Sequence, residues 1–136
     1  MFARLAAKPA LAIAATLSLA ACQTASSPDV ARAAASGVPV LIGHWADLNP
    51  DCTPTGPITL RVVKRPEHGE VTIRERSGFT FFARENPRFV CNARATPGVD
   101  VTYVSRPGYI GADSLTLEVI FTEGGQRQPT FAINVR

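Results

Sequence analysis

The feature that most constrains this fold is a two-residue alternation of apolar and polar side chains. In its longest stretch, Leu115, Leu117, Val119 and Phe121 occupy every second position. A period of two places such residues on one face of a β-strand. Gly- and Pro-rich turn signals separate the shorter runs, so the pattern predicts about seven antiparallel strands in an all-β, two-sheet sandwich. The shorter runs cover residues 40–45, 58–63, 70–74, 79–81, 101–103 and 131–135.

The first 21 residues have the three-part layout of a secretory signal, with Arg4 and Lys8 ahead of an apolar stretch. This stretch is shorter than the about 20 residues that a membrane-spanning helix needs. Leu19-Ala20-Ala21-Cys22 resembles a bacterial lipobox. That resemblance implies cleavage before Cys22, lipid on its sulfur and acylation of its amine. The alternatives are an ordinary signal peptide cleaved near Ala20, or an uncleaved anchor.

The charge balance argues against nucleic-acid binding. The whole chain has 14 basic and 11 acidic residues, a net charge of +3. Removing Arg4 and Lys8 with the signal leaves 12 basic residues against 11 acidic ones. A general nucleic-acid binder needs a larger positive surplus. The mature chain of 115 residues fits one small domain and a tether.

Residues 22–37 are expected to form the lipidated N-terminus and a flexible tether, because their Ala, Ser and Thr show no apolar period. A short helix over Val30–Ala35 is possible, although nothing in the sequence requires one. Gln23 follows the lipid cysteine, where an Asp in enterobacterial lipoproteins favours retention in the inner membrane. We therefore expect an outer-membrane anchor, with the domain on the periplasmic or the surface face.

Two further cysteines, Cys52 and Cys91, remain for the domain that begins at residue 38. The periplasm is oxidising, so we expect a structural disulfide between them. The alternative is a redox or metal-binding pair, but the chain has no Cys-x-x-Cys motif. We interpret residues 84–100 as a loop that this bridge would hold.

The segments Pro66–Val71 and Val101–Leu115 resemble bacterial Ig-like, cadherin-like repeat domains. The resemblance covers about Thr53 to Arg136 and implies an Ig-like β-sandwich over residues 38–136. Such domains serve as spacers, adhesin modules and envelope proteins, so the resemblance indicates a fold more than a function. The residues that carry it most clearly are Pro107, Gly108, Tyr109, Gly111 and Asp113.

No catalytic or metal site is predicted. The sequence has no Gly-x-Ser-x-Gly elbow, His-Glu-x-x-His motif or phosphate loop. His44, beside Trp45, and His68, in a turn, are too few for a catalytic zinc, which usually has three protein ligands. Trp45 is interpreted as packing rather than as a sugar platform. We expect no cofactor.

The middle third of the chain is rich in arginine, and several of these side chains could share a face if the disulfide folds the loop back. That face could meet an anionic envelope polymer or an acidic protein surface. The alternative is a solvated, salt-paired surface. The arginines are Arg74, Arg76, Arg84, Arg88, Arg94 and Arg106.

The sequence therefore predicts a non-enzymatic cell-envelope lipoprotein, held in the membrane by lipid on Cys22, that presents one Ig-like domain for a structural or binding role. The first alternative is an inhibitor or accessory subunit of another envelope protein. The second is a hydrolytic enzyme, for which the sequence offers no constellation.

Overall fold

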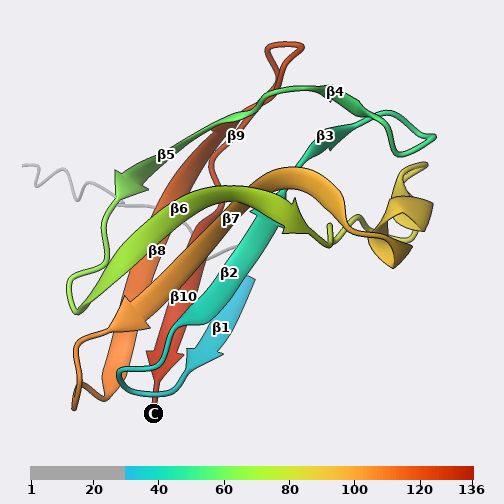
Figure 1. The fold of residues 1–136 in the computed structure, drawn as a ribbon. Helices are drawn as coiled ribbons and strands as arrows, with labels where there is room; N and C mark the ends of the chain where they lie inside the picture. The colour runs from blue at the N-terminus through green and yellow to red at the C-terminus, as the bar shows by residue number, and fades with distance from the viewer. Residues whose placement is uncertain (1–29) are drawn as a thin grey trace, which may run out of the picture.

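The computed structural model describes residues 30–136, which are coloured in Figure 1. The predicted signal segment, the lipobox with Cys22 and the tether up to residue 29 lie outside these described residues. The described part is built of β-strands and has no α-helix, since its one helical segment, η1 (Phe89–Ala93), is a 3-10 turn. No helix within residues 30–136 has the length and apolar character to cross a membrane.

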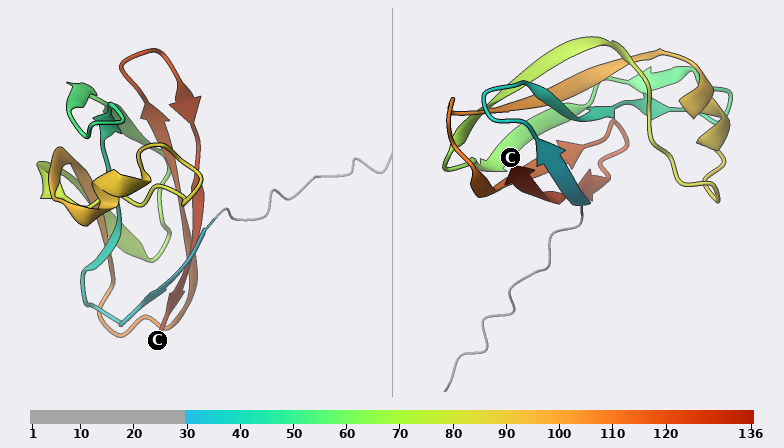
Figure 2. Two further views of the ribbon diagram at one scale, coloured as in Figure 1. Left: turned by 90° about the vertical axis from the view of Figure 1, so that its right-hand side faces the viewer. Right: turned by 90° about the horizontal axis from the view of Figure 1, so that it is seen from below.

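Two sheets pack face to face, as the two perpendicular views in Figure 2 show. The first has the order β1-β10-β8-β5, with β9 also paired to β8, and the second has the order β2-β7-β6. A short ribbon of β3 and β4 extends from one end. The predicted all-β fold is confirmed. The strands are β1 Val30–Ala34, β2 Val40–Trp45, β3 Asp47–Leu48, β4 Pro54–Gly56, β5 Thr59–Lys64, β6 Gly69–Gly78, β7 Thr96–Ser105, β8 Gly111–Ile120, β9 Gln126–Arg127 and β10 Thr130–Val135.

The core lies where the inward faces of the two sheets meet. Every second residue is buried from Val99 onward in β7, from Asp113 onward in β8 and along β10, as the two-residue period predicts. Burying each large aliphatic side chain stabilises the fold by about 1.5–3 kcal/mol. The core residues are Ala34, Ile42, Val101, Tyr103, Leu115, Leu117, Phe131, Ile133 and Val135.

Asp113 at the start of β8 joins the sheets at the end of the sandwich opposite the β3–β4 ribbon. It is 8% exposed and accepts hydrogen bonds from the Tyr103 hydroxyl and from the backbone N–H groups of Glu67, His68 and Ser114, at 2.9–3.0 Å. Burial has the largest single effect on the pKa of Asp113 and raises it. The four hydrogen-bond donors together lower the pKa by more, so that it lies below its ordinary value. Burial, and then the bond to Asp113, raise the pKa of Tyr103.

The turn before β8 uses the glycines that the Ig-like resemblance identified. Gly108 has φ +83° and Gly111 has φ +140°, conformations that glycine adopts without a Cβ clash. The Tyr109 hydroxyl donates to the Ala112 carbonyl at 2.6 Å, and the Tyr109 ring stacks on His68 with centroids 4.1 Å apart. These contacts fix the turn beside the buried Asp113.

Three segments differ from the sequence-based expectation. Residues 96–100, expected in the loop over residues 84–100, form the start of β7 and pair with β6. Residues 30–34, expected in the tether or a short helix, form β1 and pair in parallel with β10, with Val30 opposite Phe131. The predicted tether boundary at residue 37 is therefore wrong, because the backbone of β10 offers residues 30–34 a pairing partner that their own composition does not reveal. Phe79 and Phe81, expected in a strand, lie in a segment without regular structure, and both are exposed.

The loop that follows β6 is held by the expected bridge between Cys52 and Cys91, whose Cα atoms are 5.4 Å apart. Both cysteines pack with Ala46 and Leu48 in a second small apolar cluster. Asn92 also ties the loop together, because its side chain bonds the Thr80 hydroxyl and both backbone polar groups of Phe82. The disulfide thus fixes residues 79–94 against the β3–β4 ribbon.

Candidate binding groove

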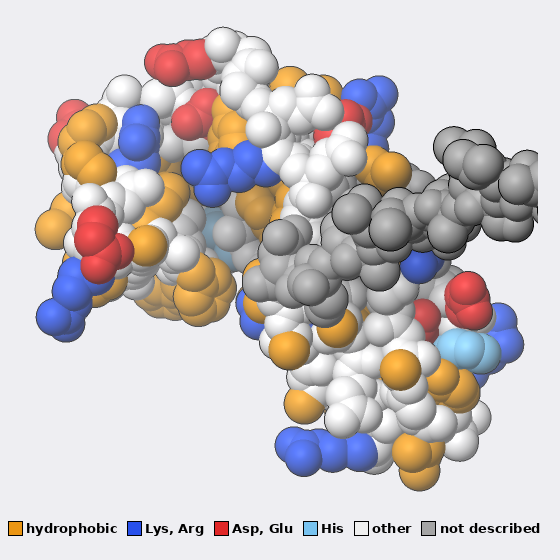
Figure 3. All heavy atoms as spheres, turned by 180° about the vertical axis from the view of Figure 1, so that it is seen from behind, with side chains coloured by type: hydrophobic (Ala, Val, Ile, Leu, Met, Phe, Trp, Pro, Cys, Tyr) orange, Lys and Arg blue, Asp and Glu red, His pale blue; other side chains and the backbone are white. Residues whose placement is uncertain are grey.

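A groove of about 1040 Å³ opens between the two sheets at the end that carries the disulfide. One wall comes from β2, β3 and the loop over residues 80–88, and the other from the ends of β8 and β10 and the β9 hairpin. Figure 3 shows this side of the molecule from behind, where a hollow separates two lobes and hydrophobic and basic side chains lie on its rim. β1, which pairs with β10, contributes Val30 and Arg32 to the lining.

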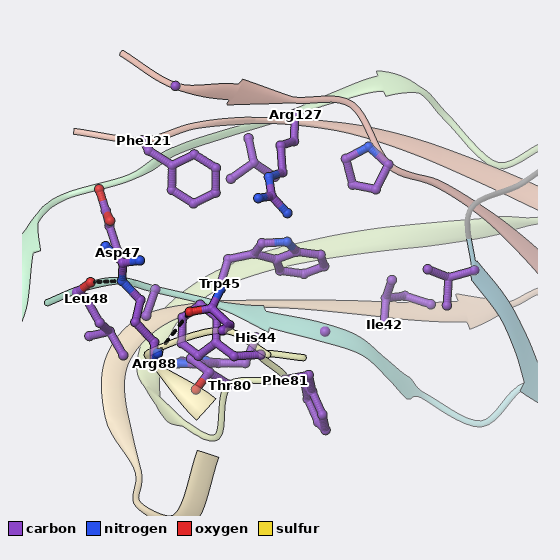
Figure 4. Close-up of a pocket in the computed structure, with 18 of the residues that line it drawn as sticks. Ile42, His44, Trp45, Asp47, Leu48, Thr80, Phe81, Arg88, Phe121 and Arg127 are labelled. Atoms are coloured by element: carbon purple, nitrogen blue, oxygen red, sulfur yellow. Dashed lines mark hydrogen bonds between the residues drawn. The ribbon is translucent and has the colours of Figure 1, made fainter. Parts of the chain in front are cut away.

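Trp45 is the central side chain of the groove. It is half-buried, and its ring meets Phe131 edge to face with centroids 6.1 Å apart. The indole lies over Gly43, where an added Cβ would come within 2.7 Å of its Cη2 atom. Figure 4 shows Phe121 and Arg127 extending from the opposite wall toward Trp45. The packing role expected for Trp45 is therefore only part of its environment, because it also lines an open groove.

Three arginines line the groove: Arg32 from β1, Arg88 from the stapled loop (residues 79–94, held by the disulfide) and Arg127 from β9. The Nε of Arg32 donates to the Ile42 carbonyl at 3.3 Å, and the Arg32 guanidinium lies 5.8 Å from the Phe131 ring centroid. Arg88 donates from Nε to the Leu48 carbonyl. Within residues 30–136, none of these arginines has a carboxylate within 4.0 Å, so their charges are not neutralised by ion pairs.

Two carboxylates, Asp47 and Glu123, also line the groove. Asp47 accepts a hydrogen bond from the Thr122 backbone at 3.1 Å, which links the two walls. Three guanidinium groups against two carboxylates leave the lining with an excess of one positive charge. The lining therefore presents charged groups of both signs with a small positive excess.

His44 stands behind Trp45 and is fully engaged in structural contacts. Its Nε2 donates to the Thr96 carbonyl at 3.1 Å, and its Nδ1 bonds the Asp100 carboxylate at 2.7 Å. Its side chain is 0% exposed. Gly78 packs on the ring so closely that a Cβ there would lie 2.5 Å from Nδ1. No ring nitrogen of His44 is free to accept a proton from a substrate.

The six arginines that the sequence singled out do not share one face. Arg74 and Arg76 are exposed on β6, where the Arg76 Nε lies 3.6 Å from Asp100. Arg84 and Arg88 lie in the stapled loop, with Arg84 over the Phe89 ring at 5.9 Å. Arg94 follows η1. Arg106 is at the other end of the sandwich, bonded to the Glu67 carbonyl at 2.8 Å.

Only Arg88 of the predicted set lines the groove, and the sequence reading missed its other two arginines. Arg32 lies in the predicted tether, and Arg127 lies outside the arginine-rich middle third of the chain. The sequence contains no signal that sets Arg127 apart from its neighbours, since Gln126, Arg127 and Gln128 all line the groove.

No metal site is found in the described part of the chain, where no three His, Cys, Asp or Glu side chains come together.

Comparisons with known proteins give little further information. No protein-family model matches the chain, and no curated protein matches it. A solved structure titled "Solution Structure of Amebosin" is similar, with 14% identity over 80% of this chain and 90% of that one and a TM-score of 0.44. That likeness is too weak to carry an argument about function.

Proposed function

We propose that this protein is a non-catalytic, outer-membrane lipoprotein whose Ig-like domain binds an anionic envelope component in the groove between its sheets. The observation that carries the proposal is the set of Arg32, Arg88 and Arg127, which line one groove without a carboxylate partner among the described residues. Guanidinium groups without a carboxylate partner can bind an anion through charge-assisted hydrogen bonds.

The environment of His44 supports a binding role over a hydrolytic one. A general base needs a ring nitrogen within reach of a substrate proton, and both nitrogens of His44 are engaged. His68 is stacked on Tyr109 at the far end of the sandwich. The groove therefore offers recognition by charge and aromatic surface, with no imidazole placed to accept a proton in it.

In-cell photo-crosslinking tests the groove. A photoreactive residue replaces Phe81, which lines the groove and is 74% exposed, and a matched control replaces Arg106 at the other end of the domain. We expect a crosslinked product from position 81 and none from position 106. Equal products from both positions, or none from either, would count against a binding role for the groove.

The anchor is tested separately by the intact mass of the native protein. We expect a chain that begins at Cys22 and carries three acyl chains, and a Cys22→Ala variant that leaves the membrane fraction. A chain that begins at another residue and has the mass of the unmodified polypeptide would refute the lipid anchor. The Gln23 argument predicts that the wild-type protein fractionates with the outer membrane.

An accessory or inhibitory subunit is the second candidate, because the stapled loop exposes several large apolar side chains. Exposed apolar clusters often mark protein-interaction sites. A discrete protein band in the crosslinking experiment would favour this candidate, whereas a smear that muramidase collapses would favour a wall polymer. The exposed side chains are Phe79, Phe81, Phe89 and Val90.

A further inference from the structure

We propose that the ligand of the groove is an acidic saccharide, a chain of sugar rings that carry carboxylate groups. This inference rests on the proposed function, because it names the chemistry of the ligand for the same groove. Three features of the groove support it: an aromatic face supported from behind, guanidinium groups fixed by backbone contacts, and a strand edge that is already occupied.

The aromatic face is that of Trp45. Gly43 supports one side of the indole, and any larger residue there would displace the ring, since its Cβ would lie 2.7 Å from Cη2. The ring lines the groove, and Arg127 and Phe121 extend toward it from the other wall (Figure 4). The C–H face of a sugar ring is apolar and packs on an aromatic surface, while its rim of hydroxyl groups stays available for hydrogen bonds.

The charged contacts would come from Arg32 and Arg88. Each uses its Nε to bond a backbone carbonyl, that of Ile42 for Arg32 and that of Leu48 for Arg88. These bonds fix both guanidinium planes, and Arg32 Nη1 is also held by the Ala31 carbonyl. The remaining terminal nitrogens can bind carboxylates with little further loss of side-chain freedom.

The same two bonds argue against a peptide strand in the groove. A guest strand adds to a sheet by pairing with the carbonyl and N–H groups along an edge. In the second sheet β2 is an edge strand, and β3 continues its course after Ala46. The carbonyls of Ile42 and Leu48 on this course are already occupied by arginines. A ligand recognised through side chains fits this wall better than one recognised through its backbone.

Arg127 is placed by its neighbours. Gln126 and Gln128 both donate to the Glu118 carboxylate, at 2.6 and 3.2 Å, and Glu118 in turn pairs with Arg61 at 2.5 Å. These bonds hold the hairpin that carries Arg127, and the Arg127 side chain extends toward Trp45 in the groove (Figure 4). Asp47 and Glu123, the carboxylates of the lining, can accept hydrogen bonds from sugar hydroxyls.

The sequence supplies a direct readout, since Trp45 is the only tryptophan of the chain. The purified full chain in detergent micelles is titrated at about 0.15 M salt with pentagalacturonate, and its tryptophan emission is followed. Neutral cellopentaose controls for the sugar ring, and pentaglutamate controls for the charge. Arg127→Gln removes one guanidinium from the groove, and Arg94→Gln is the matched control outside it.

We expect a saturable change in emission with pentagalacturonate alone. Arg127→Gln should bind pentagalacturonate about tenfold more weakly, because it loses one charge-assisted hydrogen bond, and Arg94→Gln should bind it as tightly as the wild type does. Three results would overturn the inference: no response to pentagalacturonate, equal binding of pentagalacturonate and cellopentaose, or equal or tighter binding of pentaglutamate. If the saccharide fails while the probe at position 81 still crosslinks in cells, the groove remains a binding site and only the assignment of its ligand is wrong.

Discussion

The buried Asp113 gives the sharpest test of how this domain is held together. Each of its oxygens accepts two hydrogen bonds: Oδ1 from the N–H groups of Glu67 and Ser114, and Oδ2 from His68 N–H and the Tyr103 hydroxyl. Asp113→Asn keeps the size of the side chain but turns one oxygen into an NH₂ group. With the NH₂ group on the Oδ2 side, the His68 N–H faces a donor, whereas the Tyr103 hydroxyl can turn and accept, at the end of the core where Tyr103 is 0% exposed.

The magnitude follows from one lost contact and three weakened ones. A hydrogen bond to a charged group contributes about 1.5–3 kcal/mol and a neutral one about 0.5–1.5 kcal/mol, so we expect Asp113→Asn to lower the free energy of unfolding by about 3–6 kcal/mol. The measurement is urea unfolding followed by far-UV circular dichroism with the disulfide intact. Tyr103→Phe is the matched variant, because it removes one of the four donors and leaves the carboxylate in place.

The pH dependence of stability provides a second readout of the same group. The pKa of Asp113 is lower in the folded protein than in the unfolded chain, so its contribution is present above the unfolded pKa of about 4 and is lost as the pH falls through the folded pKa. The wild type should therefore lose stability more steeply than Asp113→Asn below about pH 4. A change in unfolding free energy below about 1 kcal/mol, together with parallel acid profiles, would refute this reasoning.

Two further predictions concern the groove and the loop. Replacing Cys52 and Cys91 with alanine should lower the free energy of unfolding by about 4 kcal/mol in the chain-entropy model, because the bridge closes a sequence separation of 39 residues. Urea unfolding in the presence and absence of reductant checks this prediction. An unchanged midpoint would contradict it. Gly43→Ala should displace the Trp45 indole and shift its fluorescence emission. Gly125→Ala should leave the emission unchanged, because its added Cβ would meet only Phe121, at 3.8 Å. Equal emission from both variants would show that the indole does not lie on Gly43.

The alternation of side chains predicted the core strands well because it depends on local geometry. Leu115, Leu117 and Val119 on β8, and Ile133 and Val135 on β10, are buried as their spacing requires. The same rule was wrong for Phe79 and Phe81. Two aromatic residues at a spacing of two are compatible with a strand, but these positions have no neighbouring strand to pair with in the described structure.

The sequence predicted little of the candidate groove. It gathers Arg32, Arg88 and Arg127 from three segments that lie far apart along the chain. Composition marked the middle third of the chain as rich in arginine, but only pairing and register decide which of these side chains meet. Arg106, which sequence proximity grouped with Arg88, lies at the other end of the sandwich.

The sequence by itself determined the all-β class, the positions of the core strands and the Cys52–Cys91 bridge, because each follows from local periodicity or from the number of cysteines left for the domain. Only the tertiary structure decided that residues 30–34 complete a sheet and that a groove remains above them. Strand pairing between distant segments depends on which backbone edges are left free once the core has formed. No single segment of the chain encodes that information.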